Sequence, residues 1–193
     1  ILTGQPPPVT GVRDNGDFLL PPDAHTIAER FLEAGWSTAA FTSAFPTQAR
    51  WGFDQGFTVY HDPLTRLPAQ LDWRDQRRAN EVVDDAIASL AELQGPVLAW
   101  VHLFDAHSPY DPPEPFRSQF PRRPYDGEIA FVDSELGRLI AWWDEHHPQS
   151  VIALTADHGE GFGDGGEQTH GFLLQDGTIR VPLILRGEGI VPG

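Results

Sequence analysis

Residues 151–172 read VIALTADHGEGFGDGGEQTHGF, and this stretch decides the predicted fold. It opens with five apolar or β-branched residues, 151–155, which is the pattern of a strand buried on both faces. Asp157 and His158 follow at the expected carboxyl end of that strand, and a glycine-rich acidic loop then leads to His170. In open α/β sheets, ligands bind beyond the carboxyl ends of the strands. We therefore expect the chemistry of this protein to lie around Asp157 and His158.

Outward from this stretch, predicted helices alternate with apolar strands. Helices are expected over residues 24–34, 71–93 and 126–146, and further strands over residues 36–41, 97–103 and 181–185. Asp23 is the expected cap of the first helix, Pro182 marks a strand start or an edge, and residues 1–22 and 45–60 are expected to be irregular. This alternation predicts an α/β fold with three α/β/α layers, a mostly parallel sheet and a single domain over residues 1–193.

The amino-acid composition disfavours or excludes several kinds of binding partner and site. Among the 193 residues, 28 acidic side chains outnumber 13 basic ones, the net charge is −15, and every basic residue is Arg. A nucleic-acid partner needs a basic face, so this composition disfavours it. The lack of Cys excludes disulfides, thiolate nucleophiles and Cys-ligated zinc. No apolar run approaches the roughly 20 residues of a membrane-spanning helix.

Asp157 and His158 are candidate metal ligands, because carboxylate oxygens and imidazole nitrogens both bind divalent cations. A bound cation would also offset the field of an acidic protein that handles an anionic substrate. The alternative is that Asp157 caps a turn and His158 is a partly buried polar residue. Further polar clusters around His107 and His170 favour the metal site.

Two further residues have a chemical and a structural interpretation. His107 follows the predicted strand at residues 97–103, and it could protonate a leaving oxygen, stabilise an anion, or be a loop histidine held by neighbouring carbonyls. Asn15 lies in a predicted turn, where it could donate an amide N–H to an oxyanion or only shape the turn.

Other polar residues are expected to be structural. His102 lies inside a predicted strand and is expected to be a core histidine with its hydrogen bonds satisfied. Ser43 and Thr42 follow a different strand end, where no base is expected to pair with them. The acidic residues of the glycine-rich loop are expected to be solvated, namely Glu160, Asp164 and Glu167.

Several short motifs follow one another in order along the chain. They are Leu2-Thr3-Gly4, Gly11-Val12-Arg13-Asp14-Asn15-Gly16, Phe104-Asp105-Ala106-His107-Ser108-Pro109-Tyr110, Tyr125-Asp126-Gly127-Glu128-Ile129, Thr155-Ala156-Asp157-His158-Gly159-Glu160 and Thr169-His170-Gly171. This ordered set resembles the sulfatase family, a branch of the alkaline-phosphatase superfamily, and the resemblance spans essentially the whole chain. It implies that family's α/β fold, truncated at both ends, and a metal-dependent hydrolase of sulfuric esters.

The resemblance also implies a role for each candidate residue. Asp157 and His158 would ligate one divalent cation, with Ca²⁺ expected and Mn²⁺, Mg²⁺ or Zn²⁺ as alternatives. His107 would contact the scissile group or its leaving oxygen, and His170 would stand where the family has Lys or His. Asn15 matches an Asn near the nucleophile of some relatives. His107 and His170 are thus the catalytic candidates, and with Asn15 they are the substrate-binding candidates.

The resemblance leaves the substrate and the completeness of the site open. Many sulfatases carry Asn where this chain has His158, and the substitution leans toward relatives that hydrolyse phosphodiesters or phosphonate monoesters. The expected substrate is a small-molecule or carbohydrate sulfate ester, with a phosphoester as the alternative. The family's nucleophile, a formylglycine or a Ser or Thr, is expected a few residues before Ile1, so this chain alone is expected to be an inactive fragment. A non-catalytic binding module with the same fold is the alternative from another class.

Overall fold

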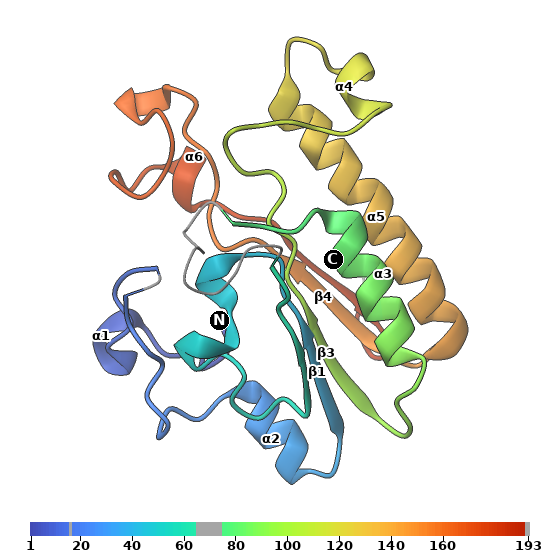
Figure 1. Ribbon diagram of the computed structural model, residues 1–193. Coiled ribbons are helices and arrows are strands. Elements are labelled where there is room, and N and C mark those ends of the chain that lie inside the picture. Colours follow the sequence, from blue (N-terminus) through green and yellow to red (C-terminus); the bar gives the residue numbers. More distant parts are fainter. Residues whose placement is uncertain (16, 65–74, 192–193) are drawn as a thin grey trace. The chain divides into compact units, whose positions relative to one another are not determined.

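The computed structural model describes residues 1–15, 17–64 and 75–191 (Figure 1). The chain forms two compact units, Ile1–Trp142 and Trp143–Gly193, and each is described by itself. The single domain expected from the sequence stays a prediction. None of the helices formed by the described residues has the length and hydropathy that a membrane span requires.

The first unit is built on a three-stranded parallel sheet. β1 (Ser37–Phe41) lies between β2 (Val59–His61) and β3 (Val97–Val101), and Ala39 is in register with Val59 on one side and Ala99 on the other. β1 is buried from its second residue onward. The helices α2 (Ile27–Glu33) and α3 (Ala79–Leu90) pack on β1 and lie on either side of it in Figure 1. The core of this unit is therefore a helix–sheet–helix sandwich, as predicted.

The helix α2 begins at a capping box rather than at the predicted Asp23. Thr26 is the N-cap: its hydroxyl accepts the main-chain N–H of Glu29 at 3.1 Å, and its own N–H donates to the Glu29 carboxylate at 2.7 Å. These two bonds satisfy two of the donors that a helix start leaves unpaired. The prediction of Asp23 as the cap was wrong, because the reciprocal pair requires Glu three residues after the cap.

The other predicted helices are present, but their bounds differ from the predicted ones. α3 begins at Ala79 rather than at residue 71, and residues 71–74 of that prediction lie outside the described residues. α5 (Pro124–His146) covers the helix predicted over residues 126–146. The sequence pattern did not predict β2 or several short elements, namely α1 (Pro7–Thr10), α4 (Phe116–Gln119), α6 (Asp176–Ile179) and the 3₁₀ turns Phe45–Thr47, Ala49–Trp51 and Asp164–Gly166.

The second unit contains an antiparallel pair of strands. β4 (Val151–Thr155) has the predicted bounds, and β5 (Leu183–Gly187) starts directly after Pro182, which supports the prediction of a strand start there. The prediction that β4 is buried on both faces was wrong, because its residues are alternately exposed and half-buried. In the described chain β4 and β5 form a two-stranded sheet, and two strands cannot cover both faces of one another.

Candidate functional site

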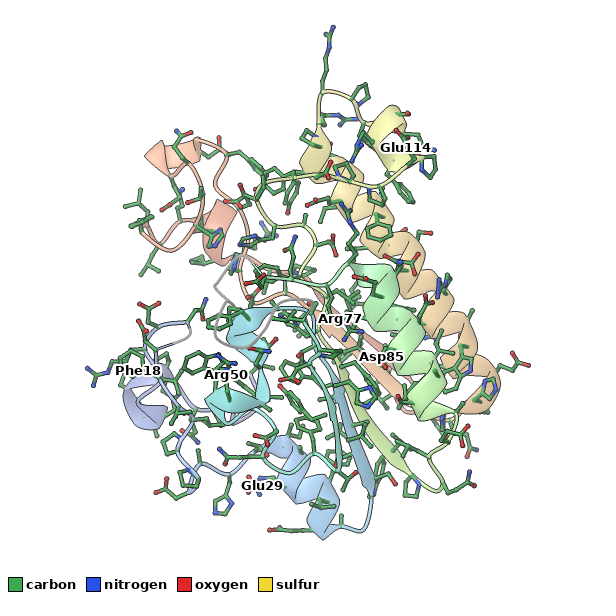
Figure 2. The ribbon with its side chains drawn as sticks, in the orientation of Figure 1. Phe18, Glu29, Arg50, Arg77, Asp85 and Glu114 are labelled. Carbon is green, nitrogen blue, oxygen red and sulfur yellow. The ribbon has the colours of Figure 1, made fainter. Side chains whose placement is uncertain are left out.

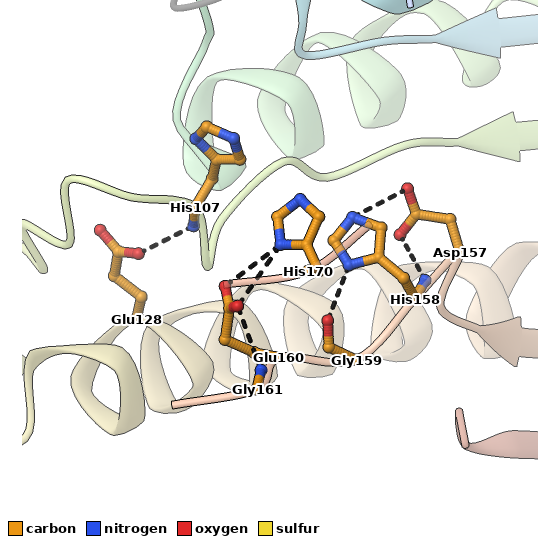
Figure 3. Close-up of polar contacts among 8 residues, drawn as sticks. All are labelled: His107, Glu128, Asp157, His158, Gly159, Glu160, Gly161 and His170. Carbon is orange, nitrogen blue, oxygen red and sulfur yellow. Dashed lines mark hydrogen bonds and ion pairs between the residues drawn. The ribbon is translucent and has the colours of Figure 1, made fainter. Parts of the chain in front are cut away.

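The end of β4 positions Asp157 and His158, which make contacts in the second unit (Figure 3). His158 Nδ1 lies 2.8 Å from the carbonyl oxygen of Gly159. A carbonyl oxygen only accepts hydrogen bonds, so Nδ1 carries the hydrogen and a neutral His158 keeps its lone pair on Nε2. The carboxylate of Asp157 accepts the main-chain N–H of His158 at 3.0 Å. His158 is thus held in a tautomer whose Nε2 can bind a cation.

The pair fits part of a divalent metal site. Asp157 Oδ2 lies 3.7 Å from His158 Nε2, and both side chains are exposed. Metal ligands lie roughly 2.0–2.6 Å from a divalent ion, so two donors at this separation can share one ion. The described residues contain no group of three or more His, Cys, Asp or Glu arranged to hold a metal. Asp157 therefore offers an oxygen ligand and His158 a nitrogen ligand. A complete metal site needs further ligands.

His170 lies against His158. Their rings stack with centroids 3.8 Å apart and planes inclined by 23°, and His170 Nδ1 is 3.4 Å from both carboxylate oxygens of Glu160. The Glu160 side chain is only 8% exposed. The prediction that Glu160 is solvated was wrong, because this carboxylate folds back on His170 and on the N–H of Gly161. Three of the five predicted site residues are thus together in this unit.

The glycine-rich loop is organised around a second buried carboxylate. Glu167 is 3% exposed and accepts the main-chain N–H of Leu173 at 2.6 Å, so the prediction of a solvated side chain was wrong here as well. Asp164 is exposed, as predicted. A Cβ at Gly161 would lie 2.5 Å from the carbonyl oxygen of Glu167, so the backbone passes too closely for any larger residue. Glycine at this position allows the loop to fold back toward His170.

His107 lies in the first unit, in the loop that follows β3. Its main-chain N–H donates to Glu128 Oε2 at 3.1 Å (Figure 3). Its ring stacks on Phe104 with centroids 4.1 Å apart. Glu128 is 3% exposed on α5, and burial raises the pKa of its carboxyl to about 7. Sequence reasoning missed Glu128. The available signal was a charged residue on the buried side of α5, three residues before Phe131.

Asn15 occupies the turn expected for it. Its main-chain N–H donates to the carboxylate of Asp14 at 2.8 Å, and the residue is exposed. An open cavity of about 320 Å³ is lined by Pro7, Val12, Arg13, Asp14 and Asn15. The turn role is therefore confirmed, whereas the role as an amide donor stays a prediction. Asn15 and His107 belong to the first unit, and their convergence with the residues of the second unit also stays a prediction.

A serine and a histidine are in contact just beyond the carboxyl ends of β1 and β3. Ser43 Oγ lies 3.0 Å from His102 Nδ1, and Ser43 is completely buried. The expectation that no base pairs with Ser43 was wrong, because residues 59 positions apart meet where the two parallel strands end. His102 has the hydrogen-bond partner expected of it, but it is half-buried and lies one residue after β3, so its expected place in the core, inside the strand, was wrong. A serine without solvent access is a structural hydrogen-bond partner and no nucleophile.

The neighbouring end of β2 carries an ion-pair network that the sequence analysis also missed. His61 Nδ1 lies 2.8 Å from Asp85 Oδ1. Arg77 donates to Asp85 Oδ2 at 3.0 Å, and Figure 2 labels both of these side chains. Arg77 is 9% exposed and also donates to the carbonyl oxygens of Thr42 and Glu81. The network connects β2, α3 and the end of β1, so it fixes the carboxyl edge of the parallel sheet.

Known structures share this fold. The chain aligns with the phosphonate monoester hydrolase of Agrobacterium radiobacter at a TM-score of 0.77 and 18% identity, over 97% of this chain and 57% of the other. It aligns with a protein solved in complex with its substrate D-glucosamine-2-N,6-O-disulfate at a TM-score of 0.74 and 16% identity, over 96% of this chain and 60% of the other. The chain thus spans just over half the length of these proteins. The predicted α/β fold class is confirmed.

Comparison of the amino-acid sequence identifies the family. Residues 1–193 match the sulfatase family model, and 88 residues are 33% identical to iduronate 2-sulfatase of Mus musculus, over 44% of this chain and 15% of that protein. The chain belongs to the sulfatase family. The resemblance drawn from the ordered motifs is therefore confirmed.

Proposed function

We propose that the full-length protein is a metal-dependent hydrolase of sulfuric esters. The observation that carries this proposal is the family match, which extends over residues 1–193. The geometry around Asp157 supports it, because an exposed carboxylate and an imidazole with Nε2 free of hydrogen are donors suited to a divalent cation.

Asp157 and His158 are the residues that would hold the cation, with Ca²⁺ expected and Mn²⁺, Mg²⁺ or Zn²⁺ as alternatives. When bound, a divalent ion supplies positive charge against the anionic ester group. In a chain of net charge −15 without any Lys, that charge also offsets the repulsion between the protein and an anionic substrate.

The side chains of this chain would bind and orient the ester. His170 is the proposed contact to the anionic group, and Glu160 orients its ring by holding Nδ1. Asn15 would donate its side-chain amide N–H to an ester oxygen. His107 would give a proton to the leaving oxygen as the bond between sulfur and that oxygen breaks, so that the alcohol or phenol departs uncharged.

The proposed substrate is a small-molecule or carbohydrate sulfate ester. One structural neighbour was solved with a sulfated glucosamine as its substrate, which supports a sugar sulfate. A phosphonate monoester or a phosphodiester is the second candidate, supported by the phosphonate monoester hydrolase neighbour and by His at position 158. The acidic composition disfavours nucleic acid.

A comparison of substrates tests the proposal. The full-length protein, replete with divalent metal, is assayed with an aryl sulfate, a glucosamine sulfate, an aryl phosphonate monoester and a diaryl phosphate. We expect the highest kcat/KM with a sulfate ester. A higher kcat/KM for the phosphonate or the phosphodiester would replace the sulfatase proposal with the second candidate. Binding of the sulfated sugar without hydrolysis of any ester would instead support a non-catalytic binding module.

A further inference from the structure

The carboxylate of Glu128 connects α5 to both ends of the segment at residues 107–111. Oε2 accepts the main-chain N–H of His107 at 3.1 Å, and Oε1 accepts the main-chain N–H of Asp111 at 2.7 Å. Each oxygen therefore serves one N–H. Because α5 is a helix of 23 residues, the carboxylate is presented by a rigid element.

The acceptor of both bonds is buried, and the two donors belong to half-buried His107 and exposed Asp111. Glu128 is 3% exposed, and the ring of His107 stacks on Phe104. A typical intramolecular hydrogen bond contributes about 0.5–1.5 kcal/mol. The two bonds therefore favour the conformation of the segment in which Glu128 reaches both N–H groups.

Charged residues of both signs lie near Glu128. Asp105 acts against the ionised form of Glu128, and Arg78 favours it. Asp105 itself accepts the main-chain N–H of Ala79 at the start of α3, and Arg78 donates to the carbonyl oxygen of Asp111. The loop after β3 is thus anchored to α3 as well as to α5, and Glu128 is the anchor that bonds directly to His107.

We propose that Glu128 is a positioning residue for His107, whose backbone it holds so that the imidazole meets the leaving oxygen of the substrate. This inference rests on the proposed function of His107 and deepens it. Glu128 does not touch the substrate, and its effect on turnover passes through His107. Displacement of a reacting group by about 1 Å costs on the order of 100-fold in rate, so the loss of the anchor should be visible in kcat.

Hydrogen exchange of the full-length protein tests the anchor itself. We expect Glu128→Ala to accelerate amide exchange at His107 and Asp111, and Glu128→Gln to do so less, because one acceptor oxygen remains. Glu135→Gln is the matched control, since Glu135 lies seven residues further along α5, is 8% exposed and has Arg138 as its ion-pair partner. Unchanged exchange at His107 in both Glu128 variants would overturn the proposal.

Kinetics on the same variants separate positioning from a general structural effect. We expect Glu128→Gln to lower kcat about 10-fold with little change in KM, and Glu135→Gln to leave both unchanged. In a His107→Ala background, Glu128→Gln should have no further effect, because both changes act on the same step. If the fold-losses in kcat of the two single variants multiply in the double variant, the two residues act independently and the proposal is overturned. Full activity of His107→Ala, with faster exchange in Glu128→Ala, would instead contradict only the proposed role of His107.

Discussion

Pro112 packs against Gly127 so closely that a Cβ at position 127 would lie 2.8 Å from the Cγ of Pro112. This contact brings α5 against the residue that follows Asp111, one position before Glu128 on the helix. The close approach therefore helps to place the Glu128 carboxylate beside the two N–H groups it binds. Glycine at this point of α5 is required by packing rather than by backbone conformation.

Gly127→Ala should consequently lower the free energy of unfolding by about 1–3 kcal/mol, because the added methyl group pushes Pro112 away. Gly137→Ala on the same helix is the matched control. Nothing lies within 4 Å of a Cβ there, so the better helix propensity of Ala should raise stability by up to about 1 kcal/mol. Thermal unfolding followed by circular dichroism compares the two. Equal shifts of Tm in both variants would contradict the close contact.

The raised pKa of Glu128 predicts a dependence of stability on pH. The carboxyl has a pKa of about 7 in the folded protein, against 4.5 for an unperturbed Glu, chiefly because burial disfavours the charged form. A group whose pKa is raised on folding stabilises the fold fully below its unfolded pKa, and this contribution is lost as the pH rises to about 7.

Wild type should therefore gain stability relative to Glu128→Gln as the pH falls from 8 to 5, by roughly 1–3 kcal/mol. Burial also raises the pKa of Asp105, and that contribution has the same sign in both proteins. Denaturant unfolding at pH 5, 6, 7 and 8 measures the difference. A difference that is constant over this range, or that grows with rising pH, would contradict the buried carboxyl.

The network at the end of β2 predicts a large cost for removing its cation. Arg77→Met should destabilise the protein by about 3–5 kcal/mol, because it leaves Asp85 and two carbonyl oxygens without their buried donor. Arg123→Met is the matched control. Arg123 pairs with Asp126 at 2.8 Å but is 70% exposed, so its loss should cost less than about 1 kcal/mol. Similar midpoints of urea unfolding for the two variants would show that the Arg77 network contributes little.

Local patterns in the sequence predicted the elements that local physics determines. The apolar run at 151–155 gave the bounds of β4, and Pro182 indicated the start of β5. The same reasoning failed on the burial of β4, because an apolar run does not say which layers cover it. It also chose Asp23 over Thr26 as a cap, although the Glu three residues after Thr26 was a readable signal.

The missed parts of the site depend on contacts between distant residues. Ser43 meets His102 across 59 positions, and His61 meets Asp85 across 24. Glu128 lies within one of the family motifs, at residues 125–129, but its partners are two main-chain N–H groups, which no sequence pattern reveals. The side-by-side residues Asp157 and His158 were found because their chemistry is visible within one stretch of sequence.

The most direct test of the proposed function is the turnover of a sulfate ester by the full-length, metal-replete protein and its Asp157→Ala variant. Asp164→Ala is the matched control, since Asp164 is an exposed carboxylate in the loop that follows. We predict that Asp157→Ala lowers kcat/KM at least about 100-fold, as loss of a charge-stabilising group does, while Asp164→Ala stays within about twofold of wild type. Turnover by Asp157→Ala equal to that of wild type would contradict the assignment of Asp157 to the metal site.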